Sequence, residues 1–401
     1  MKIGISVEEA VDLIRTHTRA LRAETRSGAD LLGRVLAEDV IAPMSQPPFD
    51  RSPLDGYALI AADTAGASKD SPVRLQVIDT VYAGGWSDVT VRPGQCVRIM
   101  TGAPIPAGAD CVIRQEDTDR GEPVVSVCQQ LKHHENYCFT GEDYQKGAVL
   151  LSAGTVLDAA ALGLLAGAGL WETPLRAHRK PTVLLVGTGD ELARPGEVLR
   201  PGQIYNSNLP QMAARCRELG LDAECRQLPD EPRAVADALQ AGTEDFDCVI
   251  STGGVSVGER DIFHQALPLA GAEQIFWRVR LKPGTPMMFS LLKGKPVLAL
   301  SGNPFAAAAT FELFARPMLE KLAGAENWAP VTLTAPLATP FGKASGGRRF
   351  VRGRYENGAV TLPEGHSSGQ LRSSVGCNCL VEIPAGSPPL GAGEKVKVVL
   401  L

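Results

Sequence analysis

The segment DCVISTGGVSVGERD at residues 247–261 combines a short apolar run with a glycine-rich loop. Residues 248–251 have the β-branched and apolar character of a buried parallel strand. In open α/β sheets, ligands bind beyond the carboxyl ends of the strands, and glycines there let the backbone approach an anion closely. Asp261 adds a carboxylate that can hold a hard cation near a phosphate. Taken alone, the segment fits either a phosphate or nucleotide site or an ordinary loop of such a sheet.

Two further strand–loop units have the same form. Residues 183–186 are apolar and run into GTGDE at 187–191, and residues 296–300 run into SGNP at 301–304. Helical spacing over 208–219, over 230–242 and from 304 toward 322 predicts crossover helices and therefore a parallel sheet. The three loops then open on one edge of the sheet. This convergence predicts an anion and metal site, with the N-terminus of the last helix beside it.

The segment RVRLKPGT at 278–285 brings cations toward the same edge. If it is a strand with Val279 and Leu281 in the core, Arg278, Arg280 and Lys282 lie on one side. The alternative is a solvated strand face.

Composition excludes several classes of protein. With 401 residues, 44% of them hydrophobic and 21% charged, the chain is typical of soluble globular proteins with two or more domains. A net charge of −5 argues against a nucleic-acid-binding surface. We expect a cytoplasmic protein that binds no membrane, since no charged leader with an apolar core begins the chain and the apolar stretch at 159–171 is too short to cross a bilayer. The nine cysteines lack zinc-site spacing, which predicts free thiols.

The first half of the chain predicts a split domain. Ser6 and Glu9 form a capping box before a helix, and residues 29–39 have a second helical pattern. A proline-rich loop at 46–60 carries Asp50 and Asp55, and strand patterns over 73–131 predict a β domain whose loop at 100–109 carries Thr101. Helical character returns after 140, so the β region is expected to be an insertion.

The C-terminal residues 329–401 are short alternating strands with turn signals, which predicts a small closed or sandwiched β module. Within it, GGRRFVRGR at 346–354 is a basic strand. Its charges fit either an anionic ligand or partner, or a solvated edge that resists aggregation.

The predicted fold class is therefore multidomain α/β plus β. A doubly wound parallel-sheet domain spans 177–327, and a helical or linker domain comprises 1–45 and 139–176. A β domain is inserted at 46–138, and a β-barrel-like domain occupies 328–401.

Seven ordered segments resemble one family, the molybdopterin molybdenumtransferases, MoeA and the E domain of gephyrin. They extend over nearly the whole chain up to about Leu319 and read PPFDRSPLDGYAL, RIMTGAPIPAGADCVIRQED, GEDYQKG, GTGDEL, ISTGGVSVGERD, RLKPGTP and ALSGNP. The resemblance implies an L-shaped homodimer of four-domain subunits, in which the α/β domain binds molybdopterin and the β domain of the other subunit closes the site. It also implies insertion of molybdate into adenylylated molybdopterin with release of AMP and use of Mg²⁺. The implied partners are a molybdopterin adenylyltransferase and cofactor-accepting molybdoenzymes or carriers.

The resemblance also implies three sets of site residues. The catalytic set is Asp55, Thr101, Asp143, Glu191, Asp261 and Lys282. The cofactor-binding set is Gly187, Thr188, Gly189, Gly253, Gly254, Ser256, Gly258, Arg278, Pro283, Gly302, Asn303 and Pro304. The metal set is Asp190, Glu191 and Asp261. Asp55, Thr101 and Asp143 are then expected on the molybdate side, and Lys282 with Arg278 as cations for phosphate or oxyanion.

Two departures from the family pattern affect these expectations. Thr285 stands where many members have a second lysine of KPGKP, which predicts a lower phosphate affinity. Phe305 and Ala306 replace the usual Val and Ser, which removes a hydroxyl near a helix N-terminus.

Two alternatives remain beside the insertase. A molybdopterin adenylyltransferase would share the α/β domain, but those enzymes generally lack the flanking domains. A non-catalytic scaffold like gephyrin would not need to keep Asp55, Asp143, Glu191 and Asp261, so their presence favours an enzyme.

Overall fold

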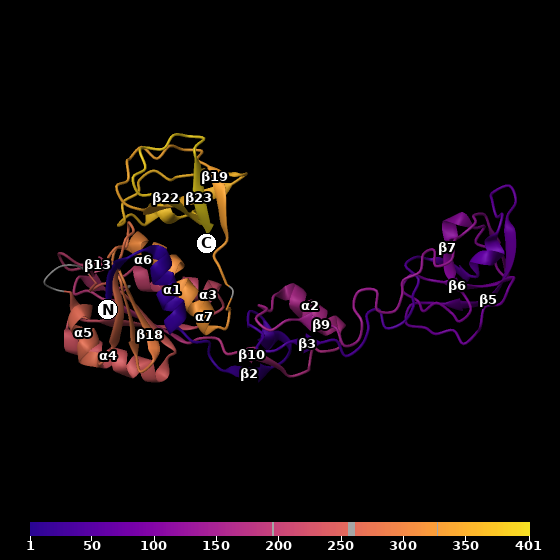
Figure 1. Ribbon diagram of the computed structural model, residues 1–401, viewed down its shortest axis with the longest axis horizontal. Coiled ribbons are helices and arrows are strands. Elements are labelled where there is room, and N and C mark those ends of the chain that lie inside the picture. The colour runs from indigo at the N-terminus through magenta and orange to yellow at the C-terminus, as the bar shows by residue number, and fades with distance from the viewer. Residues whose placement is uncertain (195, 256–260, 327) are drawn as a thin grey trace.

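The computed structural model describes residues 1–194, 196–255, 261–326 and 328–401. It is elongated, with the large α/β sheet and the C-terminal sheet at one end and a separate β sheet at the other (Figure 1). A narrow middle segment that contains helix α2 joins the two ends. The distance between the ends matters for the site, because predicted site residues lie in both.

A seven-stranded sheet forms the centre of the α/β part. Its strand order is β1 (Lys2–Ile5), β16 (Glu273–Val279), β17 (Met288–Leu292), β18 (Lys295–Leu300), β15 (Cys248–Thr252), β11 (Val183–Thr188) and β14 (Ala223–Leu228). All strands run parallel except β17, which is antiparallel to β16 and β18. Lys293 and Gly294 close the β17–β18 hairpin with positive φ at both residues, as a tight primed turn requires. The predicted parallel sheet is confirmed, apart from this one reversed strand.

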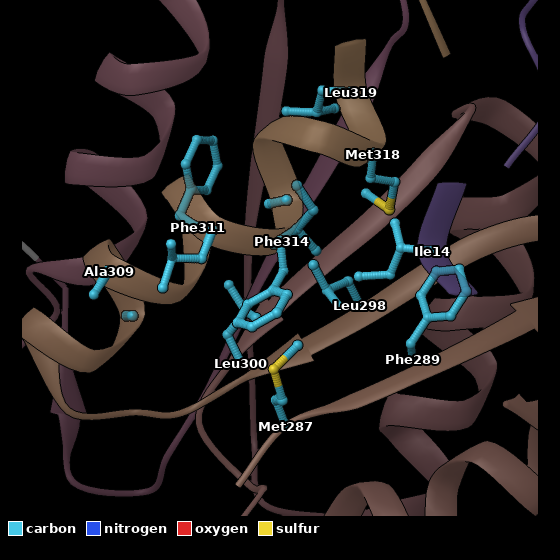
Figure 2. Packing of buried hydrophobic residues seen from close by; sticks show 14 of the residues in the cluster. Ile14, Met287, Phe289, Leu298, Leu300, Ala309, Phe311, Phe314, Met318 and Leu319 are labelled. Carbon is cyan, nitrogen blue, oxygen red and sulfur yellow. The ribbon is translucent and has the colours of Figure 1, made fainter. Parts of the chain in front are cut away.

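Helices cover both faces of this sheet, as the doubly wound prediction requires. One face packs against α1 (Val7–His17), α3 (Asn208–Glu218), α6 (Pro304–Thr310) and α7 (Arg316–Leu322), with a π-helical turn η4 (Phe311–Ala315) between the last two. Figure 2 shows Ile14, Phe314 and Met318 meeting Phe289 and Leu298 in this core. The other face packs against α4 (Pro232–Asp245) and α5 (Ile262–Ala270).

The first 17 residues differ from their predicted assignment to the N-terminal domain. Strand β1 pairs with β16, and Ile14 of α1 is fully buried in the α/β core. Periodicity predicts the helix but not its partner, which comes from strands about 270 residues further along the chain.

The middle segment contains less helix than predicted. Its elements are β2 (Ala23–Arg26) with β10 (Leu175–His178), β3 (Val40–Ile41) with β9 (Val149–Leu151), and α2 (Ala159–Gly167). The helix predicted over 29–39 is wrong, since only the 3₁₀ turn η1 (Gly28–Leu31) forms there. Gly33 has φ of +71°, which ends the turn, and Val35 and Leu36 then form bridges to Val156 and Ala177.

The inserted β sheet lies at the far end of the molecule. Its order is β7 (Cys111–Arg114), β4 (Gly56–Leu59), β6 (Gln95–Ile99), β5 (Val73–Val81) and β8 (Val124–Val127). Short 3₁₀ turns η2 (Ala61–Thr64) and η3 (Gln115–Asp117) flank it. Strands β5 and β6 are parallel, so their carboxyl ends meet at one edge.

The C-terminal sheet has the order β19 (Thr332–Pro336), β23 (Lys395–Leu400), β22 (Cys379–Ile383), β20 (Arg349–Glu356) and β21 (Ala359–Thr361), with the 3₁₀ turn η5 (Arg372–Ser374) beside it. The basic strand is β20, and it pairs on both sides. The solvated-edge interpretation is therefore wrong, and Arg352 is only 2% exposed.

Two predictions about the whole chain can be compared with the structure. All nine cysteines are free thiols, as expected. Among the described residues, no helix combines the length and the hydrophobicity needed to cross a bilayer.

Candidate active site

The three predicted loops meet at the carboxyl edge of the α/β sheet and line a cavity of about 850 Å³. These loops follow strands β11, β15 and β18. The loops converge because the three strands are adjacent and parallel. Of the predicted residues, the lining includes Thr188, Gly189, Glu191, Gly253, Gly254, Pro283, Gly302, Asn303 and Pro304. Gly369 and Leu371 of the C-terminal domain complete the wall.

Glycine is required where the loops touch one another. Gly253 has φ of +96°, and a Cβ there would lie 2.3 Å from the carbonyl oxygen of Thr188. A Cβ on Gly302 would lie 3.2 Å from the Cα of Gly253. The backbones of the three loops are therefore in direct contact, and their amide groups are brought to one mouth.

Asn208 holds two of these loops together and was not identified from the sequence. Its Nδ2 donates to Thr252 Oγ1 at 2.9 Å and to the Gly302 carbonyl at 2.7 Å. Thr252 Oγ1 in turn donates to the Ser301 carbonyl at 3.1 Å. The available signal was the polar triplet Asn206, Ser207 and Asn208 directly before an amphipathic helix.

Acidic side chains stand on the β11 side of the cavity. Glu191 folds back over the preceding loop, so that a Cβ on Gly189 would meet its carboxylate oxygens at 2.8 Å. The Asp230 amide donates to Asp190 Oδ1 at 3.1 Å, and the Asp190 amide donates to Asp230 Oδ2 at 3.3 Å. Asp230, which lines the cavity, is a further acid that the sequence interpretation missed.

Asp261 lies apart from those acids. It is the N-cap residue of α5, it is 6% exposed, and its Oδ2 lies 3.3 Å from His264 Nε2. Burial raises the pKa of the Asp261 carboxyl, and His264 and two helix amides offset only part of this effect. Ser256 and Gly258 fall in residues 256–260, outside the described residues.

The predicted row of cations does not form. Strand β16 ends at Val279, Arg278 has φ of +66°, and the chain then turns so that the Val279 amide donates to the Thr285 carbonyl at 3.1 Å. The Arg278 guanidinium stacks on Trp277 at 5.3 Å. Lys282 lines a separate cavity of about 460 Å³ with Arg280 and Arg348. The expected strand is therefore wrong, and from 278–285 only residues 283–285 line the main cavity.

A buried arginine connects the C-terminal domain to the cavity wall. The Arg352 guanidinium stacks on the Phe305 ring at 3.9 Å. It donates hydrogen bonds to the Ser367 carbonyl at 2.6 Å, to Ser374 Oγ at 2.8 Å and to the Gln370 carbonyl. These bonds hold the segment that contributes Gly369 and Leu371. The departure at Phe305 thus has a packing role, because its ring supports this guanidinium.

Asp55 and Thr101 come together at the far end of the molecule. Asp55 Oδ1 accepts hydrogen bonds from the Thr101 amide at 2.8 Å and from its Oγ1 at 2.7 Å, and these bonds lower the pKa of the Asp55 carboxyl. They meet because Asp55 precedes β4 and Thr101 follows β6, and Gly56 pairs with Ile99. Asp143 is exposed, and its amide donates to the Gln46 carbonyl. Within one chain, the β sheet that carries Asp55 and Thr101 lies far from the α/β sheet (Figure 1).

Three family models match the chain in order. The MoeA N-terminal region (domain I and II) matches residues 5–169, a probable molybdopterin binding domain matches 185–321, and the MoeA C-terminal region (domain IV) matches 334–401. A molybdopterin molybdenumtransferase of Staphylococcus aureus is 35% identical over 99% of this chain and 95% of its own length. The chain belongs to the MoeA family. It is therefore one of the transferases of molybdenum cofactor biosynthesis.

Further relatives agree with this family and with its fold. A molybdopterin molybdenumtransferase of Staphylococcus epidermidis is 33% identical over 99% of this chain and 95% of its own length. The crystal structure of a molybdopterin biosynthesis moeA protein from Pyrococcus horikoshii superposes with a TM-score of 0.85, at 30% identity, over 99% of this chain and all of that one. The elongated arrangement of this MoeA chain is thus shared with a solved relative.

Glu191 and Asp230, which line the cavity, and the neighbouring Asp190 have the chemistry that a magnesium ion requires. Asp190, Glu191 and Asp230 offer carboxylate oxygens, which hard divalent cations prefer. Among the described residues, no three His, Cys, Asp or Glu side chains converge as a ready-made metal cluster. A magnesium ion would therefore need substrate phosphate oxygens or water as further ligands, as is usual for this ion.

Proposed function

We propose that this MoeA protein inserts molybdenum from molybdate into adenylylated molybdopterin and releases AMP, working as a homodimer in the cytoplasm with Mg²⁺. The observation that carries this proposal is the cavity in which three glycine loops and two or more carboxylates open at one sheet edge. Cleavage of a phosphoanhydride requires groups that bind phosphate next to groups that bind a metal ion.

Each side of the cavity has a separate role in this proposal. The loops after β11, β15 and β18 bind the pyrophosphate through backbone amides, because their glycines allow close approach. Glu191, with Asp190 and Asp230, would hold Mg²⁺, which when bound neutralises charge on the phosphates. Arg352 contributes indirectly, because its bonds to the Ser367 and Gln370 carbonyls hold the segment that places Gly369 and Leu371 in the cavity wall.

The homodimer follows from where the second group of residues lies. Asp55 and Thr101 are paired at the end of the molecule remote from the cavity. A second copy can bring this pair to the cavity, and an isologous dimer does so twice. Partners that deliver adenylylated molybdopterin and accept the finished cofactor complete the proposal.

The test is AMP release by purified protein supplied with adenylylated molybdopterin, Mg²⁺ and molybdate. We expect release that depends on molybdate in the wild type, and a loss of roughly 100-fold in Glu191→Gln and Asp55→Asn. The matched controls are Asp237→Asn on the exposed face of α4 and Asp70→Asn in a loop of the β domain, and both should retain full activity. Formation of adenylylated product from molybdopterin and ATP would instead identify an adenylyltransferase, and no activity with an intact dimer would favour the scaffold.

A further inference from the structure

We propose that Tyr82 and Trp86 of the inserted β domain stack on a planar nitrogen heterocycle of the substrate, pterin or purine, held in the cavity of the partner subunit. This inference rests on the proposed function, since it requires the β domain of one copy to face the cavity of another. It adds a binding element for the rings to the acid–hydroxyl pair already described.

The two aromatic residues follow β5, at the same sheet edge as Asp55 and Thr101. Strands β5 and β6 are parallel, and Val81 pairs with Ile99, so the segments after them leave the sheet side by side. The Met100 amide donates to the Val81 carbonyl at 3.1 Å, and a Cβ on Gly102 would lie 3.9 Å from that of Ala83. The aromatic segment therefore adjoins Thr101 and, through it, Asp55.

Both rings face solvent in the single chain. Tyr82 is 63% exposed and Trp86 is 70% exposed, although burial of such rings is strongly favourable. Large aromatic side chains left outside the core and next to convergent polar groups are typical of ligand-contacting surfaces.

The segment that carries the rings is structurally fixed. The Gly85 amide donates to the Tyr82 carbonyl at 2.9 Å, which closes a turn in which Gly84 has φ of +82°. Immediately after Trp86, the buried Ser87 donates to Asp79 Oδ2 at 2.5 Å. A turn anchored at both ends presents its aromatic side chains with little further ordering on binding.

The neighbouring polar groups favour a heterocycle over a purely apolar partner. The Asp55 carboxylate accepts hydrogen bonds. The matching donors are the amino and ring N–H groups of a pterin, or the amino group of the adenine. Tyr82 and Trp86 supply the flat apolar surface on which such rings stack. A planar ring with N–H groups at its edge therefore matches both features of this sheet edge.

The experiment measures ligand binding and kinetics with the intact dimer. Wild type, Trp86→Ala, Tyr82→Ala and Trp86→Phe are titrated with AMP and separately with a free pterin, and KM and kcat for AMP release are measured. We expect each alanine variant to weaken binding of one ring and to raise KM about tenfold at nearly constant kcat. Trp86→Phe, which keeps a stacking surface, should stay within about threefold of wild type. Weaker binding of AMP alone identifies the purine as the stacked ring, and weaker binding of the free pterin alone identifies the pterin.

The controls separate this inference from the proposed function. Leu32→Ala removes an exposed apolar side chain elsewhere in the chain and should change nothing. Unchanged KM and unchanged binding of both rings in the alanine variants, with an active wild type, would overturn the stacking and leave the function intact. Alanine variants that lose only their interaction with an adenylyltransferase protein would also overturn the stacking. A wild type that binds AMP or pterin through Trp86 without releasing AMP would overturn the reaction instead and retain the stacking.

Discussion

Gly253 shows how a single residue determines the shape of the cavity. Its φ of +96° is unfavourable for other residues, and any Cβ would overlap the Thr188 carbonyl. We expect Gly253→Ala to lose about 2 kcal/mol of unfolding free energy and to abolish AMP binding, because two loops must separate. Chemical denaturation and AMP titration measure the two effects.

Gly271 provides the matched control for this substitution. It has φ of +79° at the C-terminus of α5, and a Cβ there would meet no atom within 4 Å. Gly271→Ala should therefore lose about 1 kcal/mol through backbone strain alone and should bind AMP normally. Normal AMP binding by Gly253→Ala would show that close contact between the loops is not needed.

Thr101 should control the acidic limb of the pH–rate profile. Its amide and hydroxyl bonds lower the pKa of the Asp55 carboxyl, so Asp55 stays ionised to lower pH than an ordinary aspartate. Thr101→Val removes the hydroxyl donor, which raises that pKa toward its usual value. We expect the acidic limb of kcat/KM to move to higher pH, and Thr101→Ser to restore it. An unshifted limb in Thr101→Val would mean that Asp55 does not set it.

At the scale of secondary-structure elements, Asp247 anchors the start of β15 to the segment that joins β10 to β11. Its carboxylate accepts hydrogen bonds from Arg179 at 2.8 and 2.5 Å and from the amide and hydroxyl of Thr182 at 2.8 and 2.9 Å. Burial alone would raise the pKa of Asp247, but the bonds from Arg179 and Thr182 outweigh it and lower the pKa. The ionised carboxylate therefore stabilises the folded α/β domain.

The sign of the pH dependence follows from this lowered pKa. The stabilisation is complete above the pKa of an aspartate in the unfolded chain, near pH 4, and is lost as pH falls through the folded-state value. We expect Asp247→Asn to lose about 2 kcal/mol at pH 7, and the difference from wild type to shrink below about pH 4. Denaturation curves at several pH values test this, with Glu244→Gln in the exposed pair with Lys293 as a control that should show little change. A difference that is constant with pH would contradict the ionic origin.

At the scale of the whole molecule, the separation of the two groups of site residues predicts complementation between inactive variants. An Asp55→Ala subunit retains its cavity, and a Glu191→Ala subunit retains its β domain. If each site is built from two subunits, their heterodimer has one complete site. Random assortment should then restore roughly one quarter of wild-type activity after the two proteins are mixed and allowed to exchange subunits.

The control for complementation is a mixture of Asp55→Ala with Thr101→Ala protein. Both lesions lie in the same β domain, so no heterodimer of these two has an intact site of the proposed kind unless the threonine is dispensable. Restored activity in this mixture but not in the first would contradict the shared site.

Much of the α/β domain could be predicted from local patterns. The strands at 183–188, 248–252 and 295–300 are strongly apolar, and each runs into a loop that contains glycine. The predicted helices over 208–219, over 230–242 and from 304 are amphipathic or apolar and form as α3, α4 and α6. Helix 29–39 was mispredicted because Gly33 and long-range bridges override a pattern that local spacing cannot distinguish from a helix. Arg278 and Lys282 were misplaced for a similar reason, since a turn at 280–285 interrupts the alternation on which the argument depended.

The sequence by itself determined the family, the three glycine loops and the acids beside them, because motifs and strand–loop boundaries are encoded by neighbouring residues. Only the tertiary structure decided that β1 joins the α/β sheet, that Asn208 and Arg352 hold the cavity wall, and that Asp55 lies at the opposite end from Glu191. These features depend on contacts between residues far apart in the chain. Packing and hydrogen bonding in three dimensions set such contacts. They leave no periodic signal in the linear sequence.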